Sequence, residues 1–322
     1  MKRFATLLLI CLLITCTAIA TADETDFEPF FRVDIDDVEA WEKPLINQRF
    51  LTADAYSFKA LDEKYGVSPD TVPSTEGLDT LNISGSAEFS EDQFRQLAAD
   101  IRALAGDRRV YVVDCRLEDH GLLNGISVSW YGSNNWANEG MTLDEAEADE
   151  AERFGSLPGT TVTAYTVKDN SRGDALEIPV ERWMTERELV ESEGFGYIRL
   201  PALDHSWPEP EAVDRFIEFA KDLDMDNTWL HFHCQAGQSR TGIFMAIYDM
   251  MKNPSVSFED IALRHAMTGS SYLPYVNTAS EMAEVYAKRA EGFRLIYDYV
   301  QENRDSGYAT PWSEWADGKM GE

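Results

Sequence analysis

The clearest candidates for covalent chemistry are a cysteine and an arginine six positions apart, Cys234 and Arg240. A cysteine thiolate is a strong nucleophile, and an arginine guanidinium binds two oxygens of a phosphate group at once. Gly237, between them, lets the backbone curl closely around an anion. A free cysteine is more often an inert core residue, but the residues at useful offsets in His233–Thr241 favour the chemical role. This spacing predicts a loop that binds a phosphate group and attacks its phosphorus with the sulfur.

Two further residues fit the steps that follow such an attack. The Thr241 hydroxyl is placed to donate a hydrogen bond to the sulfur of Cys234 and to help it leave. Asp204, in the segment Leu203–Pro208, would protonate the leaving oxygen and then, as a carboxylate, activate water. Aspartate is also a favoured helix-capping residue, and that alternative is the simpler one for Asp204 taken alone. Beside the cysteine loop, the catalytic role is the stronger prediction.

The loop must lie between a strand and a helix to bind an anion in this way. Trp229–His233 has the pattern of a buried strand, and the apolar run Thr241–Met251 follows as a helix. A turn from strand to helix points backbone N–H groups inward, and the helix N-terminus adds its positive end. Arg109–Asp114 is predicted as another buried strand, and amphipathic helices are predicted from Ser90, which starts a capping box, and from Pro208. Strands alternating with helices indicate an α/β fold with parallel neighbouring strands.

Residues 125–180 differ from the rest of the chain. They hold two β-leaning runs, Ile126–Trp130 and Thr160–Val167, around the acidic stretch Leu143–Glu152. That stretch is typical of a solvated helix face. We therefore expect one domain over residues 23–322, in which residues 125–180 form a small β-rich insertion.

The first 22 residues have the three parts of a secretory signal. Lys2 and Arg3 are followed by an apolar stretch from Phe4 to Cys16 and then by small residues with Ala-x-Ala sites. About 16 apolar residues are too few to span a bilayer, which takes about 20. The sequence therefore predicts an exported protein, periplasmic or secreted, without stable membrane insertion. A lipid anchor on Cys16 is the alternative, because the preceding residues loosely resemble a lipoprotein cleavage box.

Composition narrows the classes of partner. With 44% hydrophobic residues, the chain of 322 residues is globular and not wholly disordered. It carries 58 Asp and Glu against 28 Lys and Arg, a net charge of -30, which argues against nucleic acid or an anionic membrane as the partner. A small anionic substrate could still bind in a cleft whose local charge is positive. For a phosphorylated substrate we therefore expect either a locally positive pocket or a substrate that carries few phosphates.

The loop resembles the signature of protein tyrosine phosphatases (PTPs), His-Cys-x-x-Gly-x-x-Arg-Thr. The wider sequence resembles the bacterial PTP-like inositol phosphatases, also called cysteine phytases, from about residue 45 to residue 300. The resembling segments are Leu81–Ser86, Asp119–Gly125, Ser129–Tyr131, Asn135–Asn138, Asp204–Pro208 and His231–Thr241. The resemblance implies a PTP-like fold with a central, mainly parallel sheet flanked by helices, plus a small inserted partial β-barrel. It also implies stepwise hydrolysis of inositol hexakisphosphate through a phosphocysteine intermediate, with no metal or other cofactor.

The same resemblance assigns roles to single residues. Cys234 matches the nucleophile, Arg240 the phosphate-binding arginine and Asp204 the general acid, while His205 matches a residue that lines the pocket. The loop between Cys234 and Arg240 would bind phosphate through Gln235, Ala236, Gly237, Gln238 and Ser239. Gln235 departs from the family pattern, in which Glu is frequent, and this difference bears on substrate preference.

Basic residues outside the loop are expected to bind further phosphates. Arg49 matches a basic substrate contact from the N-terminal segment. Lys288 and Arg289 match basic residues of a late helix, and Lys64 and Arg294 are further candidates. Ordinary solvated charge is the alternative for each of them.

Cys115 and Cys234 are the two cysteines beyond the signal segment. In the implied fold, the strand Arg109–Asp114 lies beside the strand that leads to Cys234, so both thiols would lie at one end of the sheet. One hypothesis is a reversible disulfide that protects the nucleophile. The alternative is that Cys115 is a small core residue.

Other functions fit part of this pattern. A phosphotyrosine or phosphoinositide phosphatase uses the same loop, but the resembling segments outside it favour inositol polyphosphates. The loop also has no Lys between Cys234 and Arg240, which a phosphoinositide specialist would be expected to carry. A catalytically dead phosphate-binding module would have lost Cys234, Arg240 or Asp204, and all three are present. Arsenate reductases and low-molecular-weight phosphatases also carry Cys-x5-Arg, but near the chain start and with a different loop composition, whereas here the motif begins at Cys234. The leading prediction is a phosphomonoesterase acting on small inositol polyphosphates, and no oligomeric state is predicted.

Overall fold

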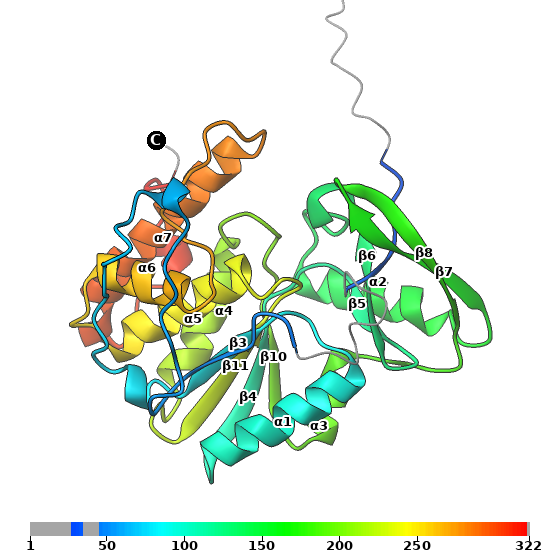
Figure 1. The fold of residues 1–322 in the computed structure, drawn as a ribbon, viewed down its shortest axis with the longest axis horizontal. Coiled ribbons are helices and arrows are strands. Elements are labelled where there is room, and N and C mark those ends of the chain that lie inside the picture. Colours follow the sequence, from blue (N-terminus) through cyan, green and yellow to red (C-terminus); the bar gives the residue numbers. More distant parts are fainter. Residues whose placement is uncertain (1–26, 35–44, 321–322) are drawn as a thin grey trace, which may run out of the picture.

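The computed structural model describes residues 27–34 and 45–320 (Figure 1). The predicted signal segment, residues 1–22, lies outside the described residues, and so does Cys16 within it, the candidate site for a lipid anchor. Within the described part, no helix is long and apolar enough to cross a membrane. Two sheets organise these residues, one of five strands and one of six.

The five-stranded sheet has the strand order β10-β4-β11-β3-β2. Its strands are β2 (Arg49–Leu51), β3 (Ile83–Ser86), β4 (Arg109–Asp114), β10 (Gly196–Arg199) and β11 (Thr228–His233). The first four strands of that order are parallel, and β2 is antiparallel to β3. All six residues of β11 are buried, as expected for a central strand covered on both faces. The predicted central, mainly parallel sheet is confirmed, and β4 lies beside β11 as predicted.

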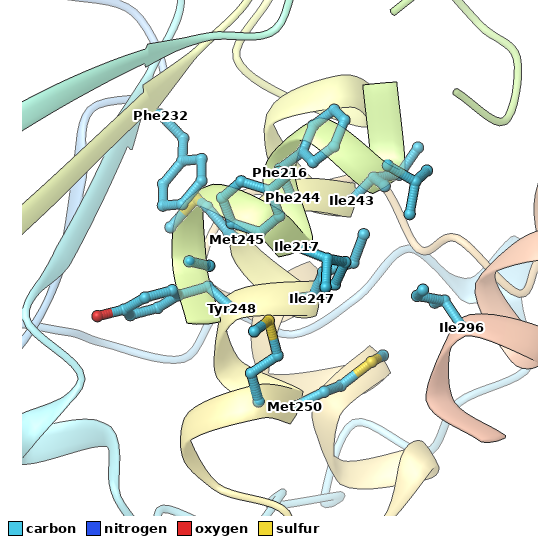
Figure 2. Close-up of a cluster of buried hydrophobic side chains, with 14 of the residues drawn as sticks. Phe216, Ile217, Phe232, Ile243, Phe244, Met245, Ile247, Tyr248, Met250 and Ile296 are labelled. Carbon is cyan, nitrogen blue, oxygen red and sulfur yellow. The ribbon is translucent and has the colours of Figure 1, made fainter. Parts of the chain in front are cut away.

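Helices cover both faces of this sheet (Figure 1). They are α1 (Glu91–Ala105), α3 (Glu186–Ser192), α4 (Pro210–Lys221), α5 (Ser239–Lys252), α6 (Phe258–Met267), α7 (Ala283–Asn303) and α8 (Trp312–Trp315). Side chains alternate between the two faces of a strand, so Phe232 joins a core with α4 and α5 while Trp229 joins a core with α1 and α3. Figure 2 shows the first of these cores, where Phe232 and Phe244 both contact Phe216.

Local sequence signals set the helix ends near the loop. α1 begins with the predicted capping box of Ser90 and Gln93. α4 begins at Pro210, slightly later than expected, with proline in its first turn. α5 begins at Ser239, ahead of Thr241, and the side chain of Gln238, its N-cap residue, makes no capping hydrogen bond. The first backbone N–H groups of α5 are therefore available to an anion.

The six-stranded sheet has the order β8-β7-β1-β6-β5-β9. Its strands are β1 (Phe30–Val33), β5 (His120–Leu123), β6 (Ile126–Tyr131), β7 (Thr161–Lys168), β8 (Ser171–Pro179) and β9 (Trp183–Met184). Closure into a partial barrel is not confirmed, because β8 and β9 are the edges of an open sheet among the described residues. β1, β5 and β9 lie outside residues 125–180, so this sheet draws on more of the chain than the β-rich stretch alone.

The acidic stretch forms α2 (Leu143–Gly155), which packs on the six-stranded sheet through Phe154. Most of its acidic side chains are solvated, as expected. Glu150 is different, because it is buried and accepts hydrogen bonds from the His120 backbone N–H at 3.0 Å and from Arg199 at 2.8 Å. This carboxylate therefore ties α2 to both sheets.

The C-terminal segment packs back on the helices. Trp312 is fully buried and contacts the rings of Tyr299 and Trp207. Trp207 belongs to the loop that carries Asp204, so the end of the chain supports that loop. Short 3₁₀ helices complete the described elements, at Glu63–Tyr65 (η2), Leu78–Thr80 (η3), Ser133–Asn135 (η4) and Arg304–Ser306 (η5).

Candidate active site

The predicted loop follows β11 and borders a pocket of about 390 Å³. Residues from the six-stranded sheet, from the loop after β11 and from α7 line this pocket. They are Arg32, Tyr65, Tyr131, Asn135, Val167, Asp204, His205, Cys234, Gln235, Ala236, Gln238, Ser239, Ser271, Tyr272, Tyr275, Tyr286 and Arg289. A larger groove of about 790 Å³ runs along α4 and the C-terminal segment, and no residue of the loop lines it. The nucleophile therefore belongs to the smaller pocket.

Cys234 is almost buried and presents its thiol at the pocket wall. The Thr241 hydroxyl donates a hydrogen bond to its sulfur at 3.1 Å, which is the contact expected from the sequence. A donor at this place stabilises negative charge on the sulfur. Both residues are held by the junction of β11 and α5, so their separation depends on local backbone geometry.

Gly237 gives the loop its tight curvature. Its φ is +68°, in the left-handed region that favours glycine. A Cβ at this position would lie 2.3 Å from the carbonyl carbon of Ser86 and 2.4 Å from the backbone nitrogen of Ala87. Both atoms are backbone and cannot move aside, so only glycine fits here.

Arg240 lies in the first turn of α5 and is fully buried. Glu118 accepts two hydrogen bonds from it, at 2.5 Å from Nη1 and 3.0 Å from Nη2. The carboxylate of Asp204 is 3.1 Å from Nη2. Burial alone would lower the pKa of Arg240, but Asp204 and Glu118 raise it, so the guanidinium is always charged. Its fork is held in one orientation, as phosphate binding requires.

Asp204 lies on the loop before α4 and reaches the pocket. Its carboxylate accepts hydrogen bonds from Asn135 at 3.1 Å and from the His205 backbone N–H at 2.9 Å. Burial raises the pKa of Asp204, but Arg240, His205 and the hydrogen bond from Asn135 together outweigh burial, so the pKa is lowered overall. In this structure Asp204 is thus an ionised partner of Arg240, and a phosphate bound to Arg240 would replace that partner.

The structure adds residues to which the sequence assigned no role. Asn135 bridges Asp204 and Glu118, donating to the latter at 2.7 Å, and the Trp136 indole donates to the Asp204 carbonyl at 2.9 Å. Asn135 and Trp136 lie in a segment that carries the family resemblance, and that resemblance is the signal in the sequence that could have identified them as site residues. Glu118, by contrast, carries no local signal in the sequence.

The loop residues and His205 line the pocket, with the exception of Gly237. Gln235 holds the loop to its surroundings, because its side chain donates to the Asp34 carbonyl at 3.2 Å and its own carbonyl accepts from the Glu88 backbone N–H at 3.1 Å. His205 has a φ of +67°, which turns the chain sharply after Asp204.

Arg49 lies in a different place from the substrate contact that was expected. It is buried against the loop and does not line the pocket. Its Nη1 donates to the Gly237 carbonyl at 2.8 Å, and its Nη2 donates to the Ser270 hydroxyl at 3.1 Å. Burial lowers the pKa of Arg49 to about 10, while the charge of Cys234 raises it. Arg49 therefore supports the loop from the side away from the pocket.

Of the basic residues expected from the late helix, Arg289 lines the pocket and Lys288 is exposed outside it. Arg289 donates to the Ser239 hydroxyl at 3.1 Å and to the His205 carbonyl at 3.2 Å, so it contacts both the loop and the Asp204 segment. Lys64 and Arg294 are exposed, paired with Asp62 and Asp298 respectively, and do not line the pocket.

A buried cluster of charges lies behind the loop. His233, directly before Cys234, is 2.7 Å from Glu186 and 3.4 Å from Glu88. Burial lowers the pKa of His233, but Glu186 and Glu88 raise it to about 10 overall. The imidazolium therefore places a positive charge beside the nucleophile.

Two sets of three residues in this cluster have metal-ligand spacing, Glu88 with Glu186 and His233, and Asp114 with His120 and Glu186. Their carboxylates already pair with protonated histidines and with two buried arginines, Arg116 and Arg199. The cluster is thus an internal ion-pair network whose carboxylates have cationic partners from the chain itself.

Cys115 is buried beside the loop. Its backbone N–H donates to the His233 carbonyl at 3.0 Å, which brings it next to Cys234 across the two strands. Both thiols are free. Burial raises the pKa of Cys115 well above its usual value, and the charge of Cys234 adds to this. The reversible disulfide stays a prediction.

Comparison with known proteins finds sequences and structures similar to this chain. The PTP-like phytase family model, described by the words "Inositol hexakisphosphate", matches residues 113–252. Among curated proteins, the effector protein hopD2 of Pseudomonas syringae pv. tomato is 29% identical over 249 residues, which are 75% of this chain and 52% of hopD2. The chain thus spans about half the length of that relative.

Two solved structures share the fold. A PTP-like myo-inositol phosphatase from Mitsuokella multacida, in complex with myo-inositol-(1,3,4,5)-tetrakisphosphate, matches with a TM-score of 0.83 and 36% identity over 92% of this chain and 50% of that one. A PTP-like phytase from Bdellovibrio bacteriovorus matches with a TM-score of 0.65 and 28% identity, over 90% of this chain and 95% of that one.

Proposed function

This chain belongs to the PTP-like phytase family, and on that premise we propose that it is a phosphoric monoester hydrolase that removes phosphate groups from myo-inositol polyphosphates. One observation carries the proposal. The pocket brings the thiol of Cys234, the carboxylate of Asp204 and the guanidinium of Arg289 to one place, and Arg240 stands beside Asp204 at 3.1 Å. A nucleophile, an acid and fixed cations are the groups that hydrolysis of a phosphate ester requires.

The first step transfers the phosphoryl group to sulfur. The Cys234 thiolate attacks phosphorus, so that an S–P bond forms while the P–O bond to the inositol breaks. Asp204 gives its proton to the departing oxygen. The bound phosphate replaces Asp204 as the partner of Arg240, which ends the ion pair that keeps Asp204 ionised in the free protein, and the carboxylate then takes up from solvent the proton that it donates. Arg240 and the N-terminus of α5 stabilise the charge on the phosphoryl oxygens.

The second step returns the nucleophile. Water attacks the phosphorus of the phosphocysteine, and the Asp204 carboxylate takes its proton. The S–P bond breaks and its electron pair goes back to sulfur, where the Thr241 hydroxyl donates a hydrogen bond. Inorganic phosphate is released, and each further round removes another phosphate group.

Phosphotyrosine in proteins is the second candidate substrate. One side of the pocket carries the aromatic rings of Tyr65, Tyr272, Tyr275 and Tyr286. The Tyr65 ring contacts that of Tyr272 at 5.5 Å and that of Tyr275 at 5.0 Å, so these residues form one aromatic surface. An aromatic surface of this kind would pack well on a flat phenyl ring.

We also propose that the protein is exported, to the periplasm or beyond the cell. The proposal rests on the signal pattern of residues 1–22. Expression of the full chain with a C-terminal tag, followed by fractionation and N-terminal sequencing, tests it. A mature N-terminus near residue 23 outside the cytoplasm supports export, and an intact Met1 in the cytoplasm contradicts it.

The test of the main proposal is phosphate release by the purified protein at mildly acidic pH with EDTA present. The substrates are inositol hexakisphosphate, a phosphotyrosine peptide and p-nitrophenyl phosphate, and Cys234→Ser is the control. Release from the inositol that the substitution abolishes supports an inositol phosphatase. A preference for the peptide would keep the chemistry and change the substrate, and no release from any substrate would contradict the proposal.

A further inference from the structure

We propose that Asn170 is a positioning residue for acid catalysis, because its side chain fixes the segment that holds Asp204 in place. The inference rests on the proposed phosphatase function and concerns the first chemical step of that function. Asn170 is exposed and does not line the pocket. It lies in the two-residue turn between β7 and β8, and it acts on the reaction through Asp204.

The turn between β7 and β8 presents the side chain of Asn170 to a neighbouring segment. Asp169 and Asn170 have φ values of +48° and +56°, as the central residues of a type I′ turn require. Asparagine is one of the few residues with a side chain that adopt this conformation. Glycine and aspartate also suit the position, so the turn itself does not require the amide group of Asn170.

The amide group of Asn170 makes hydrogen bonds to the segment that follows β6. Its Oδ1 accepts from the Tyr131 hydroxyl at 2.7 Å and from the Asn134 backbone N–H at 2.8 Å, and its Nδ2 donates to the Ser133 hydroxyl at 3.0 Å. Within the described part of the chain, Asn170 accounts for every hydrogen bond that Ser133 and Asn134 make beyond their own turn. This one side chain therefore fixes the start of η4.

η4 has a backbone conformation that needs such support. Asn134 and Asn135 both have positive φ, +55° and +67°, and two consecutive residues with side chains rarely adopt this conformation unless the surroundings impose it. Asn170 holds the start of the segment. At its other end, Asn138 donates to the Asp119 carboxylate at 2.6 Å. The path of the backbone between these two anchors is therefore fixed from outside the segment.

The residues between the two anchors hold the acid. Asn135 donates to the Asp204 carboxylate at 3.1 Å, and the Trp136 indole donates to the Asp204 carbonyl at 2.9 Å. A shift of η4 would therefore move the carboxyl group that protonates the leaving oxygen. Proton transfer requires the acid within hydrogen-bond distance of that oxygen, and a displacement of about 1 Å can slow such a step about a hundredfold.

Asn124 provides a matched control for Asn170. It has a φ of +52° in the turn between β5 and β6 of the same sheet, and its side chain makes hydrogen bonds to Pro179, Glu181 and Arg182. None of these residues lines the pocket or belongs to η4. Asn170→Gly and Asn124→Gly therefore remove comparable contacts, and glycine keeps the positive φ without strain.

The test uses two substrates that carry a single phosphate and differ in the leaving group. Phenyl phosphate has a poor leaving group that needs a proton from the acid, whereas the leaving group of p-nitrophenyl phosphate needs little protonation. The readout is the ratio of kcat/KM for phenyl phosphate to kcat/KM for p-nitrophenyl phosphate. We expect Asn170→Gly to lower this ratio about tenfold and Asn124→Gly to leave it within about twofold. The ratio does not depend on the folded fraction, because both rates come from one sample.

Two further variants show whether the effect passes through the acid. Asn170→Asp keeps the oxygen that accepts from Tyr131 and Asn134, and we expect it to restore the ratio to within about threefold of wild type. In an Asp204→Asn background, adding Asn170→Gly should change the ratio less than about twofold, because the group through which Asn170 acts has been removed.

Each contrary outcome overturns a distinguishable part of the proposal. An unchanged ratio in Asn170→Gly would show that Asn170 does not position the acid, and an equal fall in the Asp204→Asn background would show that it acts elsewhere. A fall of the same size in Asn124→Gly, or no rescue by Asn170→Asp, would contradict the specific contacts to η4. A wild-type protein that hydrolyses neither these esters nor inositol hexakisphosphate would instead overturn the proposed function itself.

Discussion

At the scale of single residues, the site is built from buried charges that hold one another in place. Arg240 is held by Glu118 and Asp204, and Asn135 bridges those two carboxylates. A buried ion left without its partner is costly, so each of these groups restrains the others. The guanidinium therefore needs little rearrangement when a phosphate arrives, which is the condition for strong electrostatic stabilisation of a transition state.

Asp204→Asn tests the role of this carboxylate as the acid. Asparagine accepts the same hydrogen bond from the His205 backbone N–H but has no proton to give. We expect kcat for inositol hexakisphosphate to fall about a hundredfold or more. The fall should be much smaller for p-nitrophenyl phosphate, whose leaving group needs little protonation. Asp62→Asn, an exposed position, is the control. Equal losses on the two substrates would argue against acid catalysis by Asp204.

Cys115→Ser tests the reversible disulfide. After peroxide converts the Cys234 thiolate to a sulfenic acid, the Cys115 sulfur would displace water and form the disulfide. Because burial raises the pKa of Cys115, we expect this reaction to speed up with rising pH. The measurement is the activity that dithiothreitol recovers after peroxide treatment. We expect wild type to recover most of its activity and Cys115→Ser clearly less, and equal recovery would contradict the disulfide.

At the scale of elements, the junction of β11 and α5 sets the geometry of the loop. β11 is buried along its whole length and α5 follows it after five residues, Cys234 to Gln238. The loop is supported from behind by Arg49, which donates to the Gly237 carbonyl, and by Ser86 and Ala87, which touch Gly237. The backbone of the loop is thus fixed before any substrate binds.

Gly237→Ala tests this packing, with Gly194→Ala as a matched control. Both glycines have positive φ, +68° and +75°, but a Cβ on Gly194 meets nothing within 4 Å. We expect Gly194→Ala to cost about 1 kcal/mol of unfolding free energy with full activity. Gly237→Ala should cost more and lower kcat/KM at least a hundredfold, because the loop must move off Ser86. Urea unfolding and p-nitrophenyl phosphate kinetics measure the two effects. Matching losses in the two variants would mean that the loop tolerates a side chain.

At the scale of the whole molecule, buried ion pairs join the two sheets and the helices behind them. Asp34 beside β1 pairs with Arg116 after β4, Glu150 of α2 pairs with Arg199 of β10, and Glu186 of α3 pairs with His233 of β11. These contacts link segments distant in the sequence, and they surround the site. The six-stranded sheet is therefore held rigidly against the loop that it helps to enclose.

The pH dependence of stability tests the pair of His233 and Glu186. The pKa of His233 is about 10 in the folded chain and about 6.5 when unfolded, so the folded state binds more protons between these values. The stabilisation is therefore complete below about pH 6.5 and is lost as the pH rises through 10. We expect the free energy of unfolding in urea to fall between pH 7 and 9.5.

Glu186→Gln separates this pair from other titrating groups. At pH 7 it should cost about 3 kcal/mol, because it leaves a buried charge without its main partner. Its unfolding free energy should also change less between pH 7 and 9.5 than that of wild type. Glu193→Gln, which breaks surface pairs with Arg95 and Arg102, should cost at most about 1 kcal/mol. Parallel pH profiles of wild type and Glu186→Gln would contradict the role of the pair.

Features that depend on neighbouring residues could be predicted from the amino-acid sequence. Backbone geometry relates residues a few positions apart, so local patterns in the sequence have structural meaning. Such patterns predicted the loop between Cys234 and Arg240, the buried strands β4 and β11, and the capping box at Ser90. The role of Asp204 could not be predicted from its own segment, since an aspartate before a helix can either cap the helix or act as an acid. The presence of the cysteine loop elsewhere in the chain favoured the acid, and in the structure Asp204 and Cys234 line the same pocket.

Which distant residues meet could not be predicted in this way, because it depends on how the elements pack in the folded chain. Arg32 and Glu118 reach the site through strand pairing and buried ion pairs, for which their own segments carry no signal. Lys288 and Arg289 are equivalent in the sequence, but successive residues of a helix point about 100° apart, so one faces solvent and the other the pocket. Arg49 lies behind the loop for the same kind of reason, because the position of β2 in the sheet sets where its side chain reaches.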